Sequence, residues 1–221
     1  MSLLPSFAEL AAAPEAPLDL LALAIAAEFR DVDAAGAIET LGILGAELAH
    51  EAQLTDGTPE QLARACVRLL GVTYGFAGDR EHYDHPDNSM LDVVLARRRG
   101  LPILLSVVYV EAARREEIPL AGVGLPGHFV VGHFGATPPL LLDPFAGGVA
   151  VASEFGPDLL RPWRAPEIAM RMLNNLMSAY QRRGDVGAAL RAAGMRLALP
   201  ADPATRDNLK AQLRSLQARL N

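Results

Sequence analysis

Residues 102–117 most constrain the fold, because they predict a helix that is apolar on nearly every side. Its first half carries apolar side chains all around the predicted helix: Ile103, Leu104, Leu105, Val107, Val108 and Val110. A helix with this pattern is buried inside a protein rather than lying on its surface. We therefore expect the core to be built around this helix.

The segment that follows predicts a β-hairpin. Residues 129–131 and 140–142 are short apolar runs, and glycines and prolines are frequent between them. Apolar runs bounded by such residues are typical of two antiparallel strands joined by a turn. Both faces of these strands are apolar, so the helix is expected to cover one of them. The predicted fold class is α+β, with a central helix packed on an antiparallel sheet.

The hairpin also predicts a paired imidazole and carboxylate. A turn centred between Gly135 and Ala136 places His128 directly opposite Asp143 on the neighbouring strand. Opposed residues have Cβ atoms about 4.5–5.5 Å apart, close enough for a carboxylate to orient an imidazole. A register shift of one residue would put the two side chains on opposite faces of the sheet.

The first half of the chain predicts helices. Residues 18–30 and 32–52 have helical apolar spacing and suggest a helical hairpin. Thr58 and Pro59 have the residue types that start a helix, and that helix places Cys66 on an apolar stripe. A buried thiol is inert, so Cys66 is expected to be a core residue. Ser89 and Asp92 have the spacing of a capping box, which predicts the start of another helix at residue 90.

The loop at residues 74–88 gathers four potential metal ligands, His82, Asp84, His85 and Asp87. Their spacing matches none of the strong zinc or calcium motifs, so we expect a solvated loop, no metal and no cofactor. The formal net charge of −6 argues against a nucleic-acid surface, which needs a concentrated excess of cations. No stretch has the length or apolar character of a membrane span, and one cysteine suits a reducing compartment. These features predict a soluble cytoplasmic protein.

Several short runs occur in a recognisable order: Gly75-Phe76-Ala77-Gly78, Tyr83, Asn88-Ser89, residues 97–102, residues 122–129 and residues 143–148. In these runs the chain resembles the bacterial SirB-type transglutaminase-like family, over about residues 18–158. The resemblance implies a helix that bears a nucleophilic cysteine at its start, packed on a sheet that supplies a histidine and then an aspartate. His128 and Asp143 match those two residues. The cysteine position falls near Pro102 or Ile103, so the nucleophile is absent, and Ser106 is the nearest hydroxyl.

The last part of the chain resembles one tetratricopeptide repeat. The likeness rests on four segments: residues 173–180, a Gly184-Asp185 turn, small residues at 188–190, and Asp202-Pro203 after the second helix. A further helix is predicted to begin near Ala204. One repeat lacks the stacking neighbours that normally supply its core, so it is expected to lean on the main domain or on a partner. The predicted organisation is a helical region at 1–72, the transglutaminase-like core at 73–160 and a helical tail at 161–221.

Three functional hypotheses follow. The first is a non-catalytic domain that binds a peptide or protein through a cleft around His128 and Asp143 and through the tail. In this hypothesis the tail can also bind another copy of the chain. The predicted binding residues are Gly124, Gly127, Phe129, Gly147 and Gly148, because glycines allow close backbone approach and leave amides free. The second is a hydrolase or acyl transferase in which His128, oriented by Asp143, activates Ser106 or water. In the third, the chain's own side chains fill the cleft.

Overall fold

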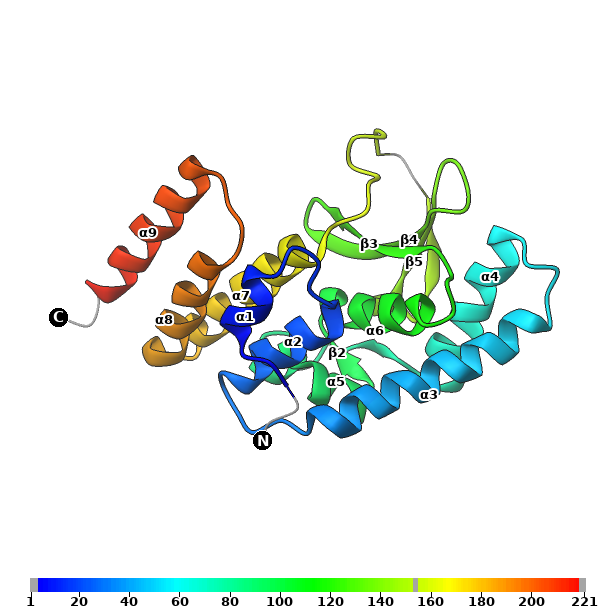
Figure 1. Cartoon of the computed structure of the whole chain (residues 1–221), viewed down its shortest axis with the longest axis horizontal. Helices are drawn as coiled ribbons and strands as arrows, with labels where there is room; N and C mark the ends of the chain where they lie inside the picture. The colour runs from blue at the N-terminus through cyan, green and yellow to red at the C-terminus, as the bar shows by residue number, and fades with distance from the viewer. Residues whose placement is uncertain (1–3, 153–154, 219–221) are drawn as a thin grey trace.

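The structure is a computed structural model that describes residues 4–152 and 155–218. Its central element is helix α6 (Pro102–Arg114), which lies against a four-stranded antiparallel sheet (Figure 1). The sheet has the order β3 (Leu120–Leu125), β4 (His128–His133), β5 (Leu140–Asp143) and β6 (Val149–Val151). The predicted α+β fold, with a central helix on an antiparallel sheet, is confirmed.

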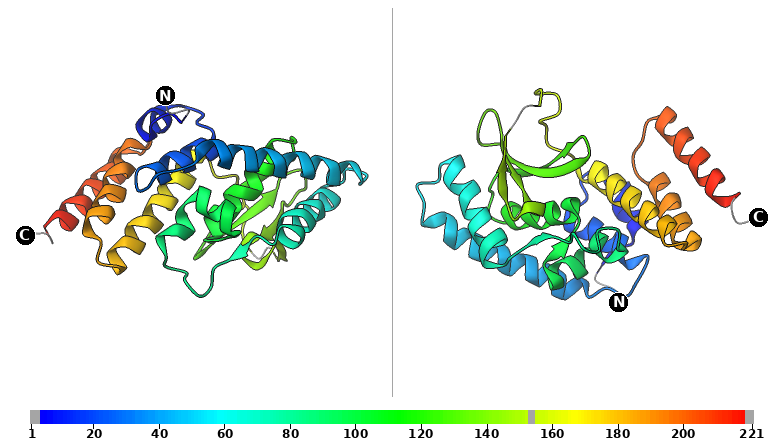
Figure 2. Two further views of the ribbon diagram at one scale, coloured as in Figure 1. Left: turned by 90° about the horizontal axis from the view of Figure 1, so that it is seen from below. Right: turned by 180° about the vertical axis from the view of Figure 1, so that it is seen from behind.

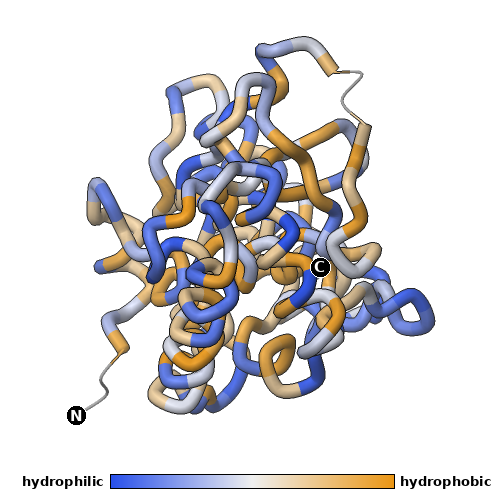
Figure 3. The backbone as a smooth tube through the Cα atoms, turned by 90° about the vertical axis from the view of Figure 1, so that its right-hand side faces the viewer, coloured by the Kyte–Doolittle hydropathy of each residue, from blue (hydrophilic) through white to orange (hydrophobic). Residues whose placement is uncertain are grey.

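A layer of helices covers the other side of α6. This layer contains α2 (Leu18–Ala27), α3 (Ala34–Gln53) and α5 (Leu91–Arg97), which lie below α6 in Figure 1. Because α6 is enclosed between the sheet and these helices, its apolar residues from Ile103 to Val108 are almost completely buried. Figure 3 shows the same separation along the backbone, with hydrophobic residues running through the middle and hydrophilic residues in the peripheral loops.

Shorter elements connect the layers. The chain begins with α1 (Phe7–Ala12), and α4 (Pro59–Cys66) runs into a π-helical segment η1 (Val67–Thr73). Strands β1 (Ala77–Gly78) and β2 (Arg99–Gly100) pair in parallel, and the 3-10 turns η2 (Pro86–Ser89) and η3 (Pro144–Ala146) lie beside α5 and β5. Through these connections η3 lies against β1, and both η2 and η3 contact α6.

Local sequence signals explain some helix starts and not others. The Thr58 hydroxyl accepts a hydrogen bond from the Gln61 amide and Pro59 is the first helical residue, as predicted. The predicted capping box at Ser89 and Asp92 is wrong, because Met90 is the N-cap of α5 and makes no side-chain cap. The Asp92 carboxylate instead accepts a hydrogen bond from Arg30, at 2.9 Å, which is distant in the sequence.

The tail consists of α7 (Ala165–Arg182), α8 (Val186–Met195), the turn η4 (Arg196–Ala198) and α9 (Pro203–Gln217). Gly184 turns the chain with a φ of 75°, and Asp185 caps α8 by accepting from the Ala188 amide. Buried residues of α7, among them Met172, Leu173 and Leu176, belong to the same core as α2 and α6. Helices α8 and α9 extend away from the sheet (Figure 2). The tail therefore packs on the main domain through α7. Its likeness to a tetratricopeptide repeat and the predicted domain boundaries stay predictions.

A buried charge network joins α2 to α6. Arg115 donates to Asp19, at 2.6 Å, and to Glu111, at 2.8 Å, and Arg114 also donates to Glu111. The side chains of Asp19 and Glu111 are only 5% and 1% exposed. Burial raises the pKa of Glu111, against the opposing effect of the two arginines. The two carboxylates are therefore out of water, and Arg114 and Arg115 supply the positive charge that pairs with them.

Of the helices that the structure describes, none combines the length and the apolar character needed to cross a bilayer.

Candidate functional site

The structure brings His128 and Asp143 together at one end of the sheet. His128 Nε2 lies 2.9 Å from Asp143 Oδ2. The predicted register is wrong, however, because β4 and β5 pair Val131 with Leu142, which places Asp143 opposite Val130 rather than His128. A shift of two residues leaves every side chain on the same face of the sheet, so His128 and Asp143 meet as diagonal neighbours.

Asp143 is held by the backbone that follows it. It is the N-cap of η3, and its Oδ1 accepts hydrogen bonds from the amides of Phe145, at 2.9 Å, and Ala146, at 3.3 Å. The Gly148 amide also donates to the Asp143 carbonyl, at 2.7 Å. Since one carboxylate oxygen is occupied by the turn, the other is fixed in the direction of His128.

The His128 ring is oriented by Asp143 and remains open on its other side. Its side chain is 34% exposed, whereas that of Asp143 is 17% exposed. Within the described part of the chain, Nδ1 has no hydrogen-bond partner and is not among the buried unpaired atoms. An imidazole in this state can accept a proton from, or bond to, a group that approaches from solvent.

Aromatic and cationic side chains border the pair. Phe145 lies edge-on to Tyr83, with ring centroids 5.8 Å apart, and the guanidinium of Arg80 lies over the Phe145 ring. From α7, Arg171 Nη2 donates to the His128 carbonyl at 2.9 Å. Sequence reasoning missed Arg80 and Arg171 because no local pattern marks them, and Arg171 follows His128 by 43 residues.

The predicted binding residues fall into two groups. Gly127 and Gly147 have φ values of 72° and 75°, and a Cβ on either would contact nothing within 4 Å, so both are open. A Cβ on Gly124 would lie 2.1 Å from the Trp163 ring, and one on Gly148 would lie 2.9 Å from Val67. Phe129 is buried. We therefore keep Gly127 and Gly147 in the candidate site, and treat the other three as packing positions.

Ser106 lies on α6 in the core. It is buried, and its hydroxyl donates to the Pro102 carbonyl at 2.8 Å, which is the bond that a serine inside a helix commonly makes. Pro102 and Ile103, at the predicted position of the family's cysteine, are buried as well. The role of Ser106 as a nucleophile stays a prediction.

Cys66, the single cysteine of the chain, is fully buried at the end of α4. Burial raises the pKa of its thiol to about 12. Beside it, the Tyr109 hydroxyl is buried without a hydrogen-bond partner among the described residues, and its pKa is raised by burial, with smaller effects from Cys66 and Asp143. The thiol and the phenol therefore belong to the core beneath the pair and not to its open face.

We expect Cys66 to resist alkylation in the native protein. Because only the thiolate reacts, a pKa of about 12 lowers its rate with iodoacetamide at pH 8 roughly a thousand-fold relative to a free cysteine. Mass spectrometry of timed samples measures the rate, and the same sample unfolded in guanidinium chloride gives the unprotected value. Rapid labelling of the folded protein at pH 8 would show that the thiol is accessible.

The loop at residues 79–88 is tied down by its own hydrogen bonds and by salt bridges. Asp79 accepts from the His82 amide and pairs with Arg97 at 3.2 Å, and Asp84 pairs with Arg182 of α7 at 2.6 Å. No group of three or more His, Cys, Asp or Glu side chains in residues 4–152 and 155–218 has the geometry to hold a metal ion.

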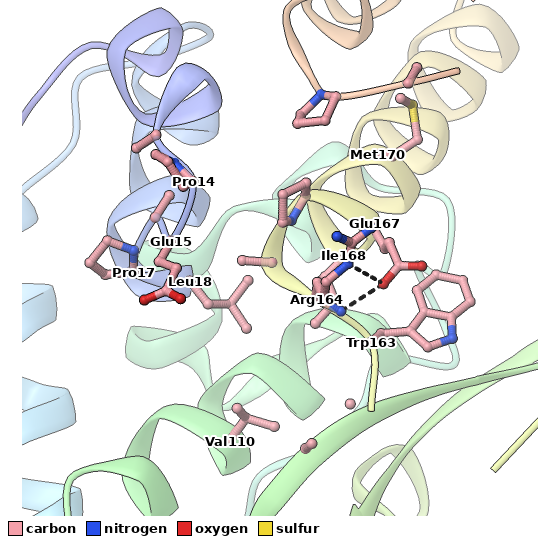
Figure 4. Close-up of a pocket in the computed structure, with 18 of the residues that line it drawn as sticks. Pro14, Glu15, Pro17, Leu18, Val110, Trp163, Arg164, Glu167, Ile168 and Met170 are labelled. Atoms are coloured by element: carbon pink, nitrogen blue, oxygen red, sulfur yellow. Dashed lines mark hydrogen bonds and ion pairs between the residues drawn. The ribbon is translucent and has the colours of Figure 1, made fainter. Parts of the chain in front are cut away.

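A large groove lies apart from the pair. It has a volume of about 1430 Å³ and runs between the segment joining α1 to α2, the start of α7 and the segment joining η4 to α9. In Figure 4, Pro14, Glu15 and Pro17 face Trp163, Arg164 and Glu167 across it, with Val110 of α6 below. Neither His128 nor Asp143 lines this groove.

An oriented histidine and aspartate on antiparallel strands, beside a buried central helix, define a transglutaminase-like domain. The model of the transglutaminase-like superfamily matches residues 36–174, and the chain belongs to this superfamily. The chain is 34% identical over 200 residues to a UPF0162 protein of Xylella fastidiosa, covering 80% of this chain and 70% of that protein. It is 30% identical over 155 residues to a UPF0162 protein of Vibrio cholerae, covering 63% and 57% of the two chains.

A more distant similarity is to human F-box only protein 21, at 30% identity over 126 residues, which covers 49% of this chain and 20% of that protein. No solved structure matches the chain. The closer likeness to the SirB-type branch stays a prediction.

Proposed function

We propose that this chain is a transglutaminase-like domain that binds a peptide or protein segment beside His128 and Asp143 without cleaving it. The observation that carries the proposal is that an oriented histidine and aspartate are present, whereas no cysteine thiol is available beside them. His128 is oriented by Asp143 at 2.9 Å and is partly exposed, whereas the one thiol of the chain is buried. A histidine in this setting is suited to hydrogen bonding with a ligand.

The surroundings of His128 support a peptide as that ligand. Gly127 and Gly147 border the pair, and no atom lies within 4 Å of the place that a Cβ would occupy on either residue. The backbone of a bound peptide can therefore approach them closely. Tyr83, which is 47% exposed, and the partly buried Phe145 offer aromatic contact area next to the pair. Helices α8 and α9 provide a second surface for a partner or for another copy of the chain.

The second candidate function is hydrolysis in which His128 activates water. The open Nδ1 favours it, since Asp143 already holds the other ring nitrogen and a water molecule can reach the free one. General-base assistance of this kind is worth roughly a hundred- to ten-thousand-fold in rate.

Substituting His128 separates the two functions. We expect pooled random hexapeptides to shift the NMR signals of the His128 ring saturably, with no cleavage products by mass spectrometry. His128→Ala, in which binding is followed through the emission of Trp163 because the His128 ring is gone, is expected to bind the same pools about ten-fold or more weakly, since a hydrogen-bonding group is lost from the contact surface. His50→Ala, which removes an exposed histidine on α3, is the matched control and is expected to have no effect.

Two results would contradict the proposal. One is peptide or ester cleavage by the wild-type protein that disappears in His128→Ala, which would establish the hydrolase instead. The other is unchanged peptide binding by a folded His128→Ala protein, which would place the binding surface elsewhere.

A further inference from the structure

Arg171 is held rigidly next to His128. Its Nη2 donates to the His128 carbonyl at 2.9 Å, and its guanidinium carbon lies 5.4 Å from the centre of the Phe129 ring and 5.8 Å from that of the Trp163 ring. A guanidinium stacked on aromatic rings loses little freedom when it binds a further group, because its orientation is already set.

Arg171 lacks an acidic partner. No carboxylate of the described residues lies within ion-pair distance of its guanidinium, and burial lowers its pKa against a smaller opposing effect from Tyr83. Two acids of the loop that packs on α7 are already engaged, Asp79 by Arg97 and Asp84 by Arg182. This is unexpected in a chain with 26 acidic and 20 basic residues.

The remaining donors of Arg171 are unpaired and are not fully buried. Its Nε and Nη1 make no hydrogen bond within the described part of the chain, and neither is among the buried unpaired atoms. Arginine stays charged at any pH that a protein tolerates, so these N–H groups and the second hydrogen of Nη2 form a permanent cationic site near His128, in which Nη2 completes a fork with Nε or with Nη1.

A second arginine borders the other member of the pair. Arg80 is exposed, lies 5.4 Å from the centre of the Phe145 ring, and has no ion-pair partner among the residues that the structure describes. Phe129 directly follows His128 and Phe145 lies two residues after Asp143. The aromatic residue that follows each member of the pair in the sequence thus carries an arginine. Asp143 forms an ion pair with neither arginine, since its oxygens contact His128 and the amides of η3.

We propose that Arg171 is a carboxylate-binding subsite, assisted by Arg80, and that the peptide bound beside His128 is recognised through a carboxylate. The carboxylate comes from the C-terminus of the peptide or from an Asp or Glu side chain, and a guanidinium fork binds either through two parallel hydrogen bonds. This inference rests on the proposed function, because it names the chemistry of the ligand for the same surface.

Three pools of random hexapeptides with acetylated N-termini test it. The first has a free C-terminal carboxylate and no Asp or Glu, the second is amidated and contains Asp and Glu, and the third is amidated without Asp or Glu. Binding to the full chain is measured by NMR from the signals of the His128 ring and the Arg171 side chain. We expect one of the first two pools to bind about ten-fold or more tightly than the third.

The variants assign the effect to Arg171. Arg171→Met is expected to abolish the preference and leave the weak binding of the third pool, whereas Arg171→Lys keeps part of the preference because it keeps the charge. The matched control is Arg183→Met, which removes an exposed arginine at the end of α7 and is expected to change nothing. Thermal unfolding and the His128 signals of each variant show that the pair is intact.

The possible outcomes separate the two proposals. Equal binding of all three pools by the wild-type protein, or a preference that survives in a folded Arg171→Met protein, overturns the carboxylate subsite and leaves the peptide-binding function standing. The absence of binding by every pool overturns both.

Discussion

Replacing Arg115 with methionine is expected to lower the free energy of unfolding by about 3–5 kcal/mol at pH 7, because it removes the close cation of the buried Asp19 and one of the two cations bonded to the buried Glu111. Arg115 donates to both Asp19 and Glu111, whose side chains are 5% and 1% exposed. Methionine preserves the apolar contacts of the arginine stem, so the loss reports the charge and not the packing.

The pH dependence of this effect has a definite sign. Burial raises the pKa of Glu111 above its ordinary value of 4.5, so the folded state holds this proton more tightly than the unfolded state. Glu111 therefore contributes a loss of stability as the pH rises above about 4.5 and through its raised pKa. Removing Arg115 takes away a cation that lowers this pKa, so the deficit of Arg115→Met is expected to be larger at pH 8 than at pH 5.

Urea denaturation of both proteins at pH 5 and pH 8 measures the deficit. Arg68→Met is the matched control, since Arg68 pairs with Glu51 at 3.2 Å on the surface, and exposed pairs contribute about 0–1 kcal/mol. If Arg115→Met were no more destabilising than Arg68→Met, the network between α2 and α6 would not require this cation.

Adding a single methyl group at Gly71 is expected to destabilise the fold by about 2–3 kcal/mol and to disturb the candidate site. A Cβ at this position would lie 2.1 Å from the Gly147 carbonyl oxygen and 3.0 Å from the Tyr109 hydroxyl. The obstacle is backbone, so the loop at Gly147 and Gly148 must move. That loop is bonded to Asp143 through the Gly148 amide, so the orientation of His128 is expected to change with it.

Thermal or urea unfolding gives the stability of Gly71→Ala, and NMR of the His128 ring reports the site. Gly42→Ala is the control, because Gly42 lies on the exposed side of α3 with nothing within 4 Å of its Cβ position. Alanine is favoured over glycine inside a helix by about 1 kcal/mol, so Gly42→Ala is expected to stabilise the protein. Equal stability changes in the two variants would mean that the contact between η1 and the loop is loose.

The central helix and the sheet were predictable because they depend on apolar patterns within one segment. Nearly every position from Ile103 to Val108 is apolar, and only an enclosed helix satisfies this. The strand register was not predictable, since β4 and β5 are apolar on both faces and no alternation fixes which residues oppose one another. Strand β3 was also missed. It contains Gly122 and Gly124, which weaken the strand pattern and which the structure uses to accommodate the rings of Phe129 and Trp163.

The candidate site was predictable only in part. His128 and Asp143 lie in short runs that carry a family resemblance, and the structure joins them at 2.9 Å. Arg171 gave no local signal, because it reaches His128 only after α7 folds back onto the sheet. The partner of Asp92 was hidden for the same reason, since the contact is made by Arg30 from a distant segment.

The position of Trp163 has a practical consequence. It is the one tryptophan of the chain, and it touches Gly124 and Phe129 on the sheet while stacking near Arg171. Its emission therefore reports on the environment of that guanidinium from inside the intact protein, with no dye attached. A titration followed by tryptophan fluorescence gives an optical readout of whatever engages Arg171.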